Sequence, residues 1–598
     1  MRRLTIPVYL TVQGPVITKS SAIGELGVDA LMATGSFADP QMGNIEKRYY
    51  VPGTLIKGIL REAWQELAAA DGKFGEWLEW LGKESPKDSD DAPERGRLRF
   101  SDFADWETEP AASDRQRYRI QIDEDSGAVK GGQFQVMESP YAPGQEIRLA
   151  GEVRVIMSSG ENETALLAAI QHGLSWAQAV GGTRTAGFGQ ILKAALGLTV
   201  GETLPAATNA GTGWHVRMTF QQPVIFSLRR IAGNLFESGM VIPGAALKGA
   251  VAEMMRREPG LFRELANELH GVRFTHAFPA LKGGTRPRHW PLSLLAFAKD
   301  DKTHEFADVI RCERPFTRVA LAGAFDIDWK ESQEWKEVLK SYGWEKIKTE
   351  LRVRTAIEGE RQKARDEALF AWEMLAPHEH EWIAEVAAEG LTAAARQQLE
   401  QLLHFGIEPL GKTKARAKVT LEPKTAAAVP SAASYAVTLQ TPALLINPGG
   451  HLAPNGAIGS ASANLLRLEY EAVWKELSDG SLALANYFQR VSLAGGDYMR
   501  KRFRQPSPYR PYLLTDAGST FLLKPVAGRE KKAHDSMTAW VEKGLGLRTR
   551  VKQFYGINDV PGEKLWAHCP YLPENGYGEV TVNQESRYPE APECTTND

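Results

Sequence analysis

The sequence contains one short motif twice, and this duplication limits what the chain can fold into. The order Pro-Gly-x-x-[Leu/Ile]-Lys-Gly occurs at residues 52–58 and again at residues 243–249. Pro-Gly is typical of a turn, and the apolar residues that follow it recur at helical spacing. Two segments far apart in the chain are therefore predicted to build the same local structure, a turn that leads into a helix.

The start of such a helix combines free backbone N–H groups, the positive end of the helix dipole and one lysine. Phosphate is a natural ligand of that combination. A solvated lysine at an ordinary helix start is the alternative interpretation, but duplication of the Lys-Gly pair favours binding. The candidate contacts to a polyanion in these two stretches are Lys57, Arg61, Lys248 and the glycines Gly53, Gly58, Gly244 and Gly249.

Composition limits the kinds of partner. The chain has 598 residues with a formal net charge of -3, so any nucleic-acid surface must be local. Three cysteines lie far apart and form no metal-binding pattern, which fits a reduced, cytoplasmic compartment. The first residues alternate between apolar and polar, which predicts a strand rather than a signal peptide. No apolar run is long enough to span a bilayer, and we expect no membrane partner.

Three segments of the chain open in the same way, with an alternating strand that runs into a proline at residues 15, 223 and 442. In the first two, the helix motif, an Arg-Phe pair and a closing glycine or lysine loop follow in the same order. Strands that open and close a segment with helices between them predict an α+β domain on an antiparallel sheet. The predicted domains are module 1 (1–200), module 2 (212–424), a divergent module 3 (434–584) and a disordered tail (585–598).

The closing loops carry glycine or positive charge. Residues 181–189 read Gly-Gly-x-Arg-x-x-Gly-Phe-Gly, and residues 411–418 place cations at the matching position. Glycines let a backbone approach a polyanion closely. A tight structural turn explains the glycines equally well, although it does not explain the cations. The candidates in these loops are Gly181, Gly182, Gly187, Gly189, Arg184, Lys412, Lys414 and Arg416.

Module 3 lacks the Pro-Gly helix but holds the densest basic and aromatic run of the chain, at residues 498–512. Arginines pair with phosphates while rings stack on unpaired bases, a combination suited to single-stranded RNA. A solvated strand face is the alternative. The candidates are Arg500, Arg502, Arg504 and Tyr509.

Acidic candidates for catalysis are few. Asp29 lies in a glycine-bearing loop after the first strand, and module 2 has no aspartate in the matching loop. A lone loop aspartate is commonly a turn or cap residue. Asp39 is the second choice. His378 and His380 are not set with partners as zinc ligands.

These residues resemble the RAMP superfamily, the backbone proteins of type III CRISPR effector complexes. The likeness rests on the Pro-Gly helix, Arg-Phe-Ser-Asp at residues 99–102, Arg-x-x-Ile-Asp at residues 119–123 and the loop at residues 181–189. Module 1 looks most like the target-cleaving backbone subunit and module 2 like a degenerate copy. Module 3 is a more distant likeness, with the capping subunit as its candidate type.

The resemblance implies tandem ferredoxin-like, RRM-related modules that bind CRISPR guide RNA and present it to complementary target RNA for antiviral defence. It also implies a protruding hairpin in each of the first two modules, at residues 122–143 and 357–377. Further implied partners are the large polymerase-like subunit, the small helical subunit and other RAMP proteins.

The same resemblance implies metal-dependent cleavage of target RNA through Asp29, which would bind the metal. We expect Mg²⁺ as the metal, no organic cofactor and one cut site rather than two. Two alternatives stay open: a non-catalytic RNA-binding scaffold, and a guide-processing endoribonuclease that would need an acid/base such as His172 near the glycine loop.

Overall fold

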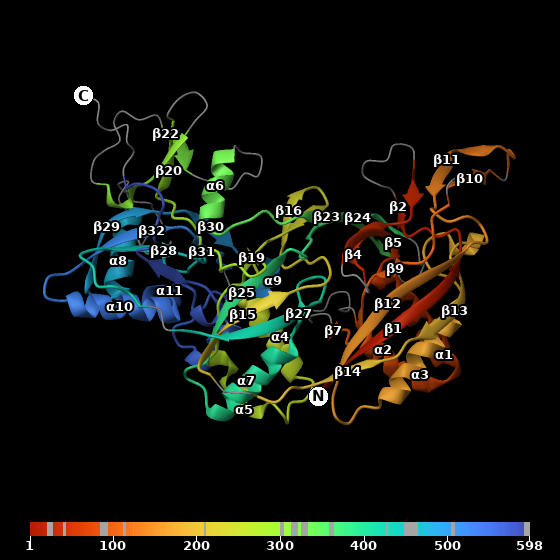
Figure 1. Ribbon diagram of the computed structural model, residues 1–598, viewed down its shortest axis with the longest axis horizontal. Helices are drawn as coiled ribbons and strands as arrows, with labels where there is room; N and C mark the ends of the chain where they lie inside the picture. Colours follow the sequence, from red (N-terminus) through yellow and green to blue (C-terminus); the bar gives the residue numbers. More distant parts are fainter. Residues whose placement is uncertain are drawn as a thin grey trace.

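The structure is a computed structural model of three similar units in a row. It describes residues 1–20, 28–39, 44–83, 94–111, 115–123, 125–207, 211–298, 304–312, 321–324, 333–357, 364–425, 428–447, 465–503 and 509–590. Each unit has an antiparallel sheet with helices packed on it, and we keep the names module 1, module 2 and module 3. Figure 1 shows module 1 in red and orange at one end of the molecule and module 3 in blue at the other.

Module 1 contains a β-α-β-β-α-β unit with the strand order four-one-three-two. The first strand is β1 (Arg2–Gln13), flanked by the fourth and third strands, and the second strand is split in two. The elements are β13 (Gln190–Leu196), β1, β12 (Glu146–Met157), β8 (Arg99–Phe100), β9 (Phe103–Asp105), α1 (Gly53–Ala70) and α3 (Glu163–Trp176). Further strands extend the sheet: β5 (Ile45–Val51), β4 (Thr34–Ala38) and β14 (Val200–Thr203).

The sequence pattern explains this core. Apolar residues of β1 are buried at alternate positions from Leu4 to Leu10, as a strand with one face on a core requires. The predicted helical positions in α1 are also confirmed, and its buried residues are Gly53, Ile56, Ile59, Leu60, Ala63 and Trp64. Helices α1 and α3 pack these residues against the same face of the sheet, so the start of α1 lies at one end of that layer (Figure 1).

Modules 2 and 3 have the same strand order as module 1, four-one-three-two, which reads two-three-one-four from the other edge of the sheet. Module 2 uses β18 (Arg273–Phe274), β19 (Phe278–Leu281), β25 (His380–Ala387), β15 (Gly213–Thr219), β27 (Ala415–Pro423) and β26 (Ile407–Leu410), with α4 (Gly244–Met255), α5 (Arg263–Glu268) and α7 (Ala393–Phe405). Module 3 uses β29 (Leu482–Phe488), β32 (Thr520–Pro525), β28 (Tyr435–Leu439) and β33 (Val580–Val582), with α8 (Leu465–Leu477), α10 (Glu530–Lys543) and α11 (Thr549–Phe554). The predicted fold class, tandem ferredoxin-like modules on antiparallel sheets, is therefore confirmed.

Module 2 also contains inserted elements. In module 2 they are a small sheet of β20 (Leu294–Ala298), β21 (His304–Asp308) and β22 (Leu321–Ala324), and helix α6 (Gln333–Ser341). Residues 585–590 were expected to begin a disordered tail, but they pack against this sheet: the Asp308 N–H donates to the Pro589 carbonyl (2.9 Å), and the Tyr588 ring meets Phe306. Residues 591–598 lie outside the described residues.

Each of the first two modules also carries a long hairpin. In module 1 it is β10 (Gln116–Ile122) with β11 (Val129–Glu138), and in module 2 it is β23 (Thr349–Ile357) with β24 (Ala364–Leu375). The expected hairpin ranges began too late, because the first strand of each precedes residue 122 or 357. Short strands β3 (Ala30–Leu31) and β17 (Leu235–Ser238) run parallel to β11 and β24.

Buried charges join modules 1 and 2. The fully buried Arg3 guanidinium donates to Glu408 (2.5 Å) and to Glu202 (2.8 Å), and it stacks over the Phe405 ring at 3.8 Å. Neighbouring arginines, Arg3 first, hold the pKa of Glu408 below its ordinary value against the opposing effect of burial. One carboxylate of module 2 thus fixes the first strand of module 1.

We predict that Glu408→Gln destabilises the protein by about 3–5 kcal/mol, because it removes one partner of a buried ion pair. The control is Glu107→Gln, whose pair with Arg148 is exposed (2.8 Å) and should contribute less than about 1 kcal/mol. Urea unfolding followed by tryptophan fluorescence measures both. Equal losses in the two variants would contradict the assignment of Glu408 as the central charge of the junction.

Candidate nucleic-acid interface

The start of helix α1 is capped by the protein itself. The Gly53 N–H, expected to be free for an anion, donates to Asp102 Oδ1 (2.9 Å), and the Gly244 N–H of α4 donates to His276 Nδ1 (3.3 Å). A Cβ on Gly53 would collide with the Ser101 carbonyl, so this glycine is required by packing. The expectation of a free first amide was therefore wrong in both copies.

The second glycine of the motif is different. Gly58 and Gly249 lie inside their helices and are exposed, and a Cβ at either would meet no described atom within 4 Å. Glycine in a helix costs about 1 kcal/mol relative to alanine. No contact within the described protein accounts for that cost, so both positions leave room for the close approach of another molecule.

Lys57 of module 1 lies near enough to Lys414 of module 2 for the charge of Lys414 to act on it. Burial lowers the pKa of Lys57 to about 8, and the charges of Lys414, Arg61 and Arg99 add to this effect. Burial likewise lowers the pKa of Lys414 to about 8, with Arg99 and Arg95 adding to it. Among the described residues, the charged neighbours that shift the pKa of these two lysines are all cations. We call Lys57, Arg61, Arg95, Arg99 and Lys414 the junction cluster.

Local structure explains how Lys414 reaches this place. It follows the turn at Gly411, where a Cβ would collide with the Ile225 carbonyl, and the Lys412 N–H donates to the same carbonyl (2.8 Å). Lys414 itself has a left-handed backbone with φ of 52°. Such a conformation is uncommon for a residue with a side chain. The closing loop of module 2 is thus held tightly while it presents a lysine to module 1.

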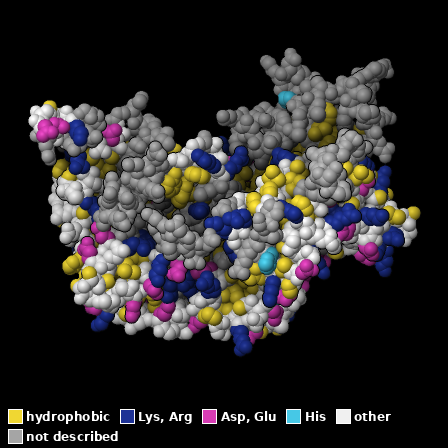
Figure 2. All heavy atoms as spheres, turned by 180° about the vertical axis from the view of Figure 1, so that it is seen from behind, with side chains coloured by type: hydrophobic (Ala, Val, Ile, Leu, Met, Phe, Trp, Pro, Cys, Tyr) yellow, Lys and Arg dark blue, Asp and Glu magenta, His cyan; other side chains and the backbone are white. Residues whose placement is uncertain are grey.

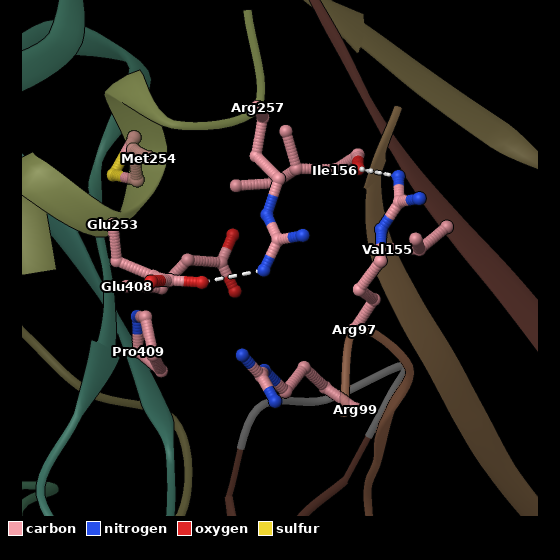
Figure 3. A pocket seen from close by; sticks show the side chains of 9 residues that line it. All are labelled: Arg97, Arg99, Val155, Ile156, Glu253, Met254, Arg257, Glu408 and Pro409. Carbon is pink, nitrogen blue, oxygen red and sulfur yellow. Dashed lines mark hydrogen bonds and ion pairs between the residues drawn. The ribbon is translucent and has the colours of Figure 1, made fainter. Parts of the chain in front are cut away.

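A small polar cavity adjoins the cluster. Figure 3 shows Arg99 of module 1 reaching toward the side of the cavity where Glu408 and Pro409 of module 2 lie. Arg97 also lines the cavity, but its guanidinium points to the Ile156 carbonyl, to which it donates (3.3 Å). The cavity volume of about 20 Å³ is enough for one water molecule. Burial lowers the pKa of Arg99 to about 10. Arg99 therefore belongs both to the cavity and to the junction cluster.

Other predicted cations have partners within the protein. Arg184 pairs with Glu62 of α1 (3.0 Å), and Arg416 forms a two-pronged pair with Glu202 (2.5 Å). Lys248 is buried, and its ammonium donates to the carbonyls of His270 and Val272, both at 2.9 Å. These contacts tie elements or modules together.

The Arg61 guanidinium donates to the Leu81 carbonyl (3.0 Å) while remaining in the cluster, and Lys412 is exposed. In module 3, Arg500 and Arg502 are exposed on the short helix α9 (Asp497–Arg502). The Tyr509 hydroxyl accepts the Gly496 N–H (2.5 Å). Arg504 lies outside the described residues.

The glycine loop of module 1 is mainly structural. Gly181 and Gly189 have left-handed backbones, and a Cβ at either would collide with a carbonyl of Ile17 or Val180. Gly182 donates its N–H to Ile17 (2.8 Å). Gly187 has φ of 80° with no described neighbour within 4 Å of a Cβ, and a Cβ on Gly182 would meet only the Ile17 carbonyl at 3.8 Å, so these two glycines leave an open approach.

Asp29 is exposed at the entry to β3. Its backbone N–H donates to the Val136 carbonyl and its Oδ2 accepts the Val136 N–H, both at 2.7 Å. In module 2 the parallel pairing of β17 with β24 puts Leu235 at the matching position, beside Ala371. Asp39 lies at the end of β4, where its N–H donates to Asn44 (2.8 Å). No group of three potential metal ligands occurs among the described residues.

Sequence reasoning missed Arg95 and Arg99 as members of the site. The signal was the alternation of arginine at residues 95, 97 and 99, which places cations on one face of an extended segment. Figure 2 shows Lys and Arg side chains in a broken band across the middle of the face opposite to that of Figure 1. The basic surface is local, as the net charge required.

Comparison with known proteins identifies the first module. Residues 11–192 match the family model of the RAMP superfamily. Module 1 belongs to the RAMP superfamily. No curated protein matches the chain.

Among solved structures, a chain of a type IV-B CRISPR complex is 15% identical and covers 33% of this chain and 90% of its own, with a TM-score of 0.22. A chain of a type III-B Cmr-beta complex bound to cognate target RNA is 10% identical and covers 52% of this chain and 86% of its own, with a TM-score of 0.28. Among the described residues of the chain, no helix has the length and apolar character needed to cross a membrane.

We predict that Lys57 titrates near pH 8 and that Lys414→Ala raises its pKa, because the substitution removes a nearby positive charge. Carbon-13 NMR of the reductively methylated protein follows this titration. Lys532→Ala, which removes an exposed lysine of α10 paired with Asp479, is the control and should leave the pKa of Lys57 unchanged. An identical Lys57 titration in the wild-type and Lys414→Ala proteins would show that the two lysines do not interact.

Proposed function

We propose that this RAMP protein is a guide-RNA-binding subunit of a type III CRISPR ribonucleoprotein that acts in antiviral defence. The observation that supports the proposal is the junction cluster, in which Lys57 and Lys414 are half-buried among arginines and the charge of Lys414 reaches Lys57. Like charges held together are costly in the free protein. A phosphate backbone that crosses the junction would relieve this repulsion.

The surroundings of the cluster suit a nucleic-acid backbone. Gly58 follows Lys57 directly and leaves open space, so a phosphate could approach the helix closely. Lys412 is exposed in the closing loop that carries Lys414. The exposed arginines of α9 would add contacts on module 3. The proposed partners are guide RNA, complementary target RNA and other subunits of the effector.

The double variant Lys57→Ala/Lys414→Ala should weaken guide-RNA binding roughly 10- to 100-fold, because charge-assisted contacts to phosphate are lost. It should also reduce the slope of log K against log salt by about 1.4, the value for two phosphates of a single strand. Filter binding across salt concentrations measures both, and Lys532→Ala is the matched control. Unchanged affinity and slope would exclude the junction as the RNA site.

A pH series gives an independent arm of the same experiment. Both lysines have a pKa of about 8 in the free protein. They lose their protons as the pH rises from 7 to 9, so RNA affinity should fall over that interval. Lys57→Arg/Lys414→Arg keeps its charge at these pH values and should flatten the dependence.

The proposal extends to cleavage of target RNA at Asp29. Asp29 is exposed, and the Val136 N–H donates to one of its carboxylate oxygens, Oδ2 (2.7 Å). Mg²⁺ commonly binds one or two carboxylates together with substrate phosphates and water. One exposed carboxylate fits that pattern, and the metal would supply charge stabilisation at the phosphate. No organic cofactor is proposed.

Two observations bear on whether each module is catalytic. Leu235 replaces the acid in module 2, so the proposal contains one cut site. The lack of a three-ligand group among the described residues favours the non-catalytic scaffold as the second candidate function. A guide-processing role would draw on His172, whose ring meets Phe74 on the helical side of module 1.

Asp29→Asn should reduce cleavage of a labelled complementary RNA in Mg²⁺ by at least about 100-fold, with guide and target binding retained. The assembled complex is the material to assay, and Asp39→Asn is the matched control. Cleavage that persists in Asp29→Asn and is lost in Asp39→Asn would move the chemistry to the second acid. Cleavage in EDTA would favour the guide-processing alternative.

A further inference from the structure

Two lysines of the junction cluster are open to small molecules. Lys57 and Lys414 are half-buried, and among the described residues neither amino nitrogen is a buried atom or the donor of a hydrogen bond to the protein. Gly58, next to Lys57, is exposed, and a Cβ there would meet no described atom within 4 Å. A reagent from solvent can therefore reach these amino groups.

The charges that act on these amino groups are positive. Lys414, Arg61 and Arg99 act on Lys57, and Arg99 and Arg95 act on Lys414. Lys57 and Arg61 lie one turn apart on the same side of α1. Arginine presents several N–H donors that match the oxygens of a phosphate group. The junction thus places amino groups beside cations that suit a phosphate-bearing reagent.

The amino groups are also available as nucleophiles. A lysine attacks an electrophile only in its uncharged form. Burial lowers the pKa of Lys57 and of Lys414 to about 8, so roughly half of each is uncharged near pH 8. An ordinary lysine, with a pKa of about 10.4, is then less than about 1% uncharged.

Lys248 of module 2 has the same lowered pKa in a different setting. Burial lowers its pKa to about 8, and the charged group that acts on it is an acid, Glu574. Lys248 is only 8% exposed, and its ammonium donates to the carbonyls of His270 and Val272, both at 2.9 Å. Access and positive neighbours, rather than the pKa, therefore distinguish the lysines of the junction cluster.

We propose that Lys57 and Lys414 are acylation sites whose acyl donors are acyl phosphates, the mixed anhydrides of a carboxylic acid and phosphoric acid. The arginines of the junction cluster hold the phosphate group while the uncharged amine attacks the carbonyl carbon. A C–N bond forms, the C–O bond to the phosphate breaks, and inorganic phosphate leaves with the electron pair. The nitrogen loses one proton to water. The product is a neutral amide, so each acylation removes one positive charge.

The consequence for RNA binding rests on the proposed function, in which the junction cluster holds a phosphate backbone. Acylation removes charges that the backbone would contact. Bound RNA in turn covers the amino groups that an acyl phosphate must reach. Acylation and guide binding therefore exclude one another, and the acylated chain is a form of the protein that does not load guide RNA.

Acetyl phosphate tests the sites on the free, full-length chain at pH 8. Mass spectrometry of proteolytic peptides follows the acetylation of each lysine with time. Lys57 and Lys414 should react at least about tenfold faster than Lys193, an exposed lysine of β13, because a larger fraction of them is uncharged. Lys248 should stay unmodified. Equal rates at Lys57, Lys414 and Lys193 would overturn the proposal, and so would a Lys248 that reacts as fast as Lys57.

A competition experiment tests whether the cations hold the donor. Inorganic phosphate should slow the reaction of acetyl phosphate at Lys57 and Lys414 and leave the rate at Lys193 unchanged. The uncharged reagent N-hydroxysuccinimide acetate should prefer the two lysines less strongly than acetyl phosphate does. Equal preference for both reagents, with no competition by phosphate, would overturn the role of the arginines.

Guide RNA provides the last arm of the experiment. Saturating guide RNA should slow acetylation of Lys57 and Lys414 at least about tenfold, with Lys193 unaffected. Fast acetylation that RNA does not slow would overturn the exclusion between acylation and guide binding, and would count against the junction as the RNA site. Slow acetylation of the free chain would overturn the acylation sites alone. The two failures are therefore distinguishable.

Discussion

The buried pair between Arg3 and Glu408 is the interaction on which the rest of the structure depends. It joins the first strand of module 1 to the end of module 2, and at the resulting junction the charge of Lys414 reaches Lys57. Two ammonium groups with lowered pKa repel one another, so some other attraction must hold the modules in place. Opposite charges buried below the surface provide that attraction. The cations above them are then available to bind a polyanion.

The two copies of the Pro-Gly helix motif make different contacts in modules 1 and 2. The cap of α1 is an aspartate that accepts an arginine from module 2, whereas the cap of α4 is a histidine covered by module 3. Lys57 remains in the junction cluster, but its counterpart Lys248 is buried against two carbonyls. The same helix start therefore contributes to a basic surface in one module and to a protein contact in the next.

Much of the fold could be predicted from local patterns. Alternation in β1 and helical spacing in α1 report directly which side of an element is buried, because periodicity and burial have the same cause. The Pro-Gly motif gave the position of the helix start correctly. The free amide expected there was wrong, because Asp102 comes from the link between β8 and β9, 49 residues further on, and nothing local indicates that it caps the helix. Residues 585–590 were misread for a similar reason, since their packing partner is an insertion of module 2.

The sequence by itself determined the repeated ferredoxin-like units, the kinds of residue at their loops and the absence of a global basic charge. Only the tertiary structure decided which of those residues meet. Arg184, Lys248 and Arg416 looked equivalent to Lys57 and Lys414 in the sequence, but they found carboxylates or carbonyls within the protein. The physical reason is that the availability of a charge depends on its neighbours in space, and those neighbours are set by how one module docks on the next.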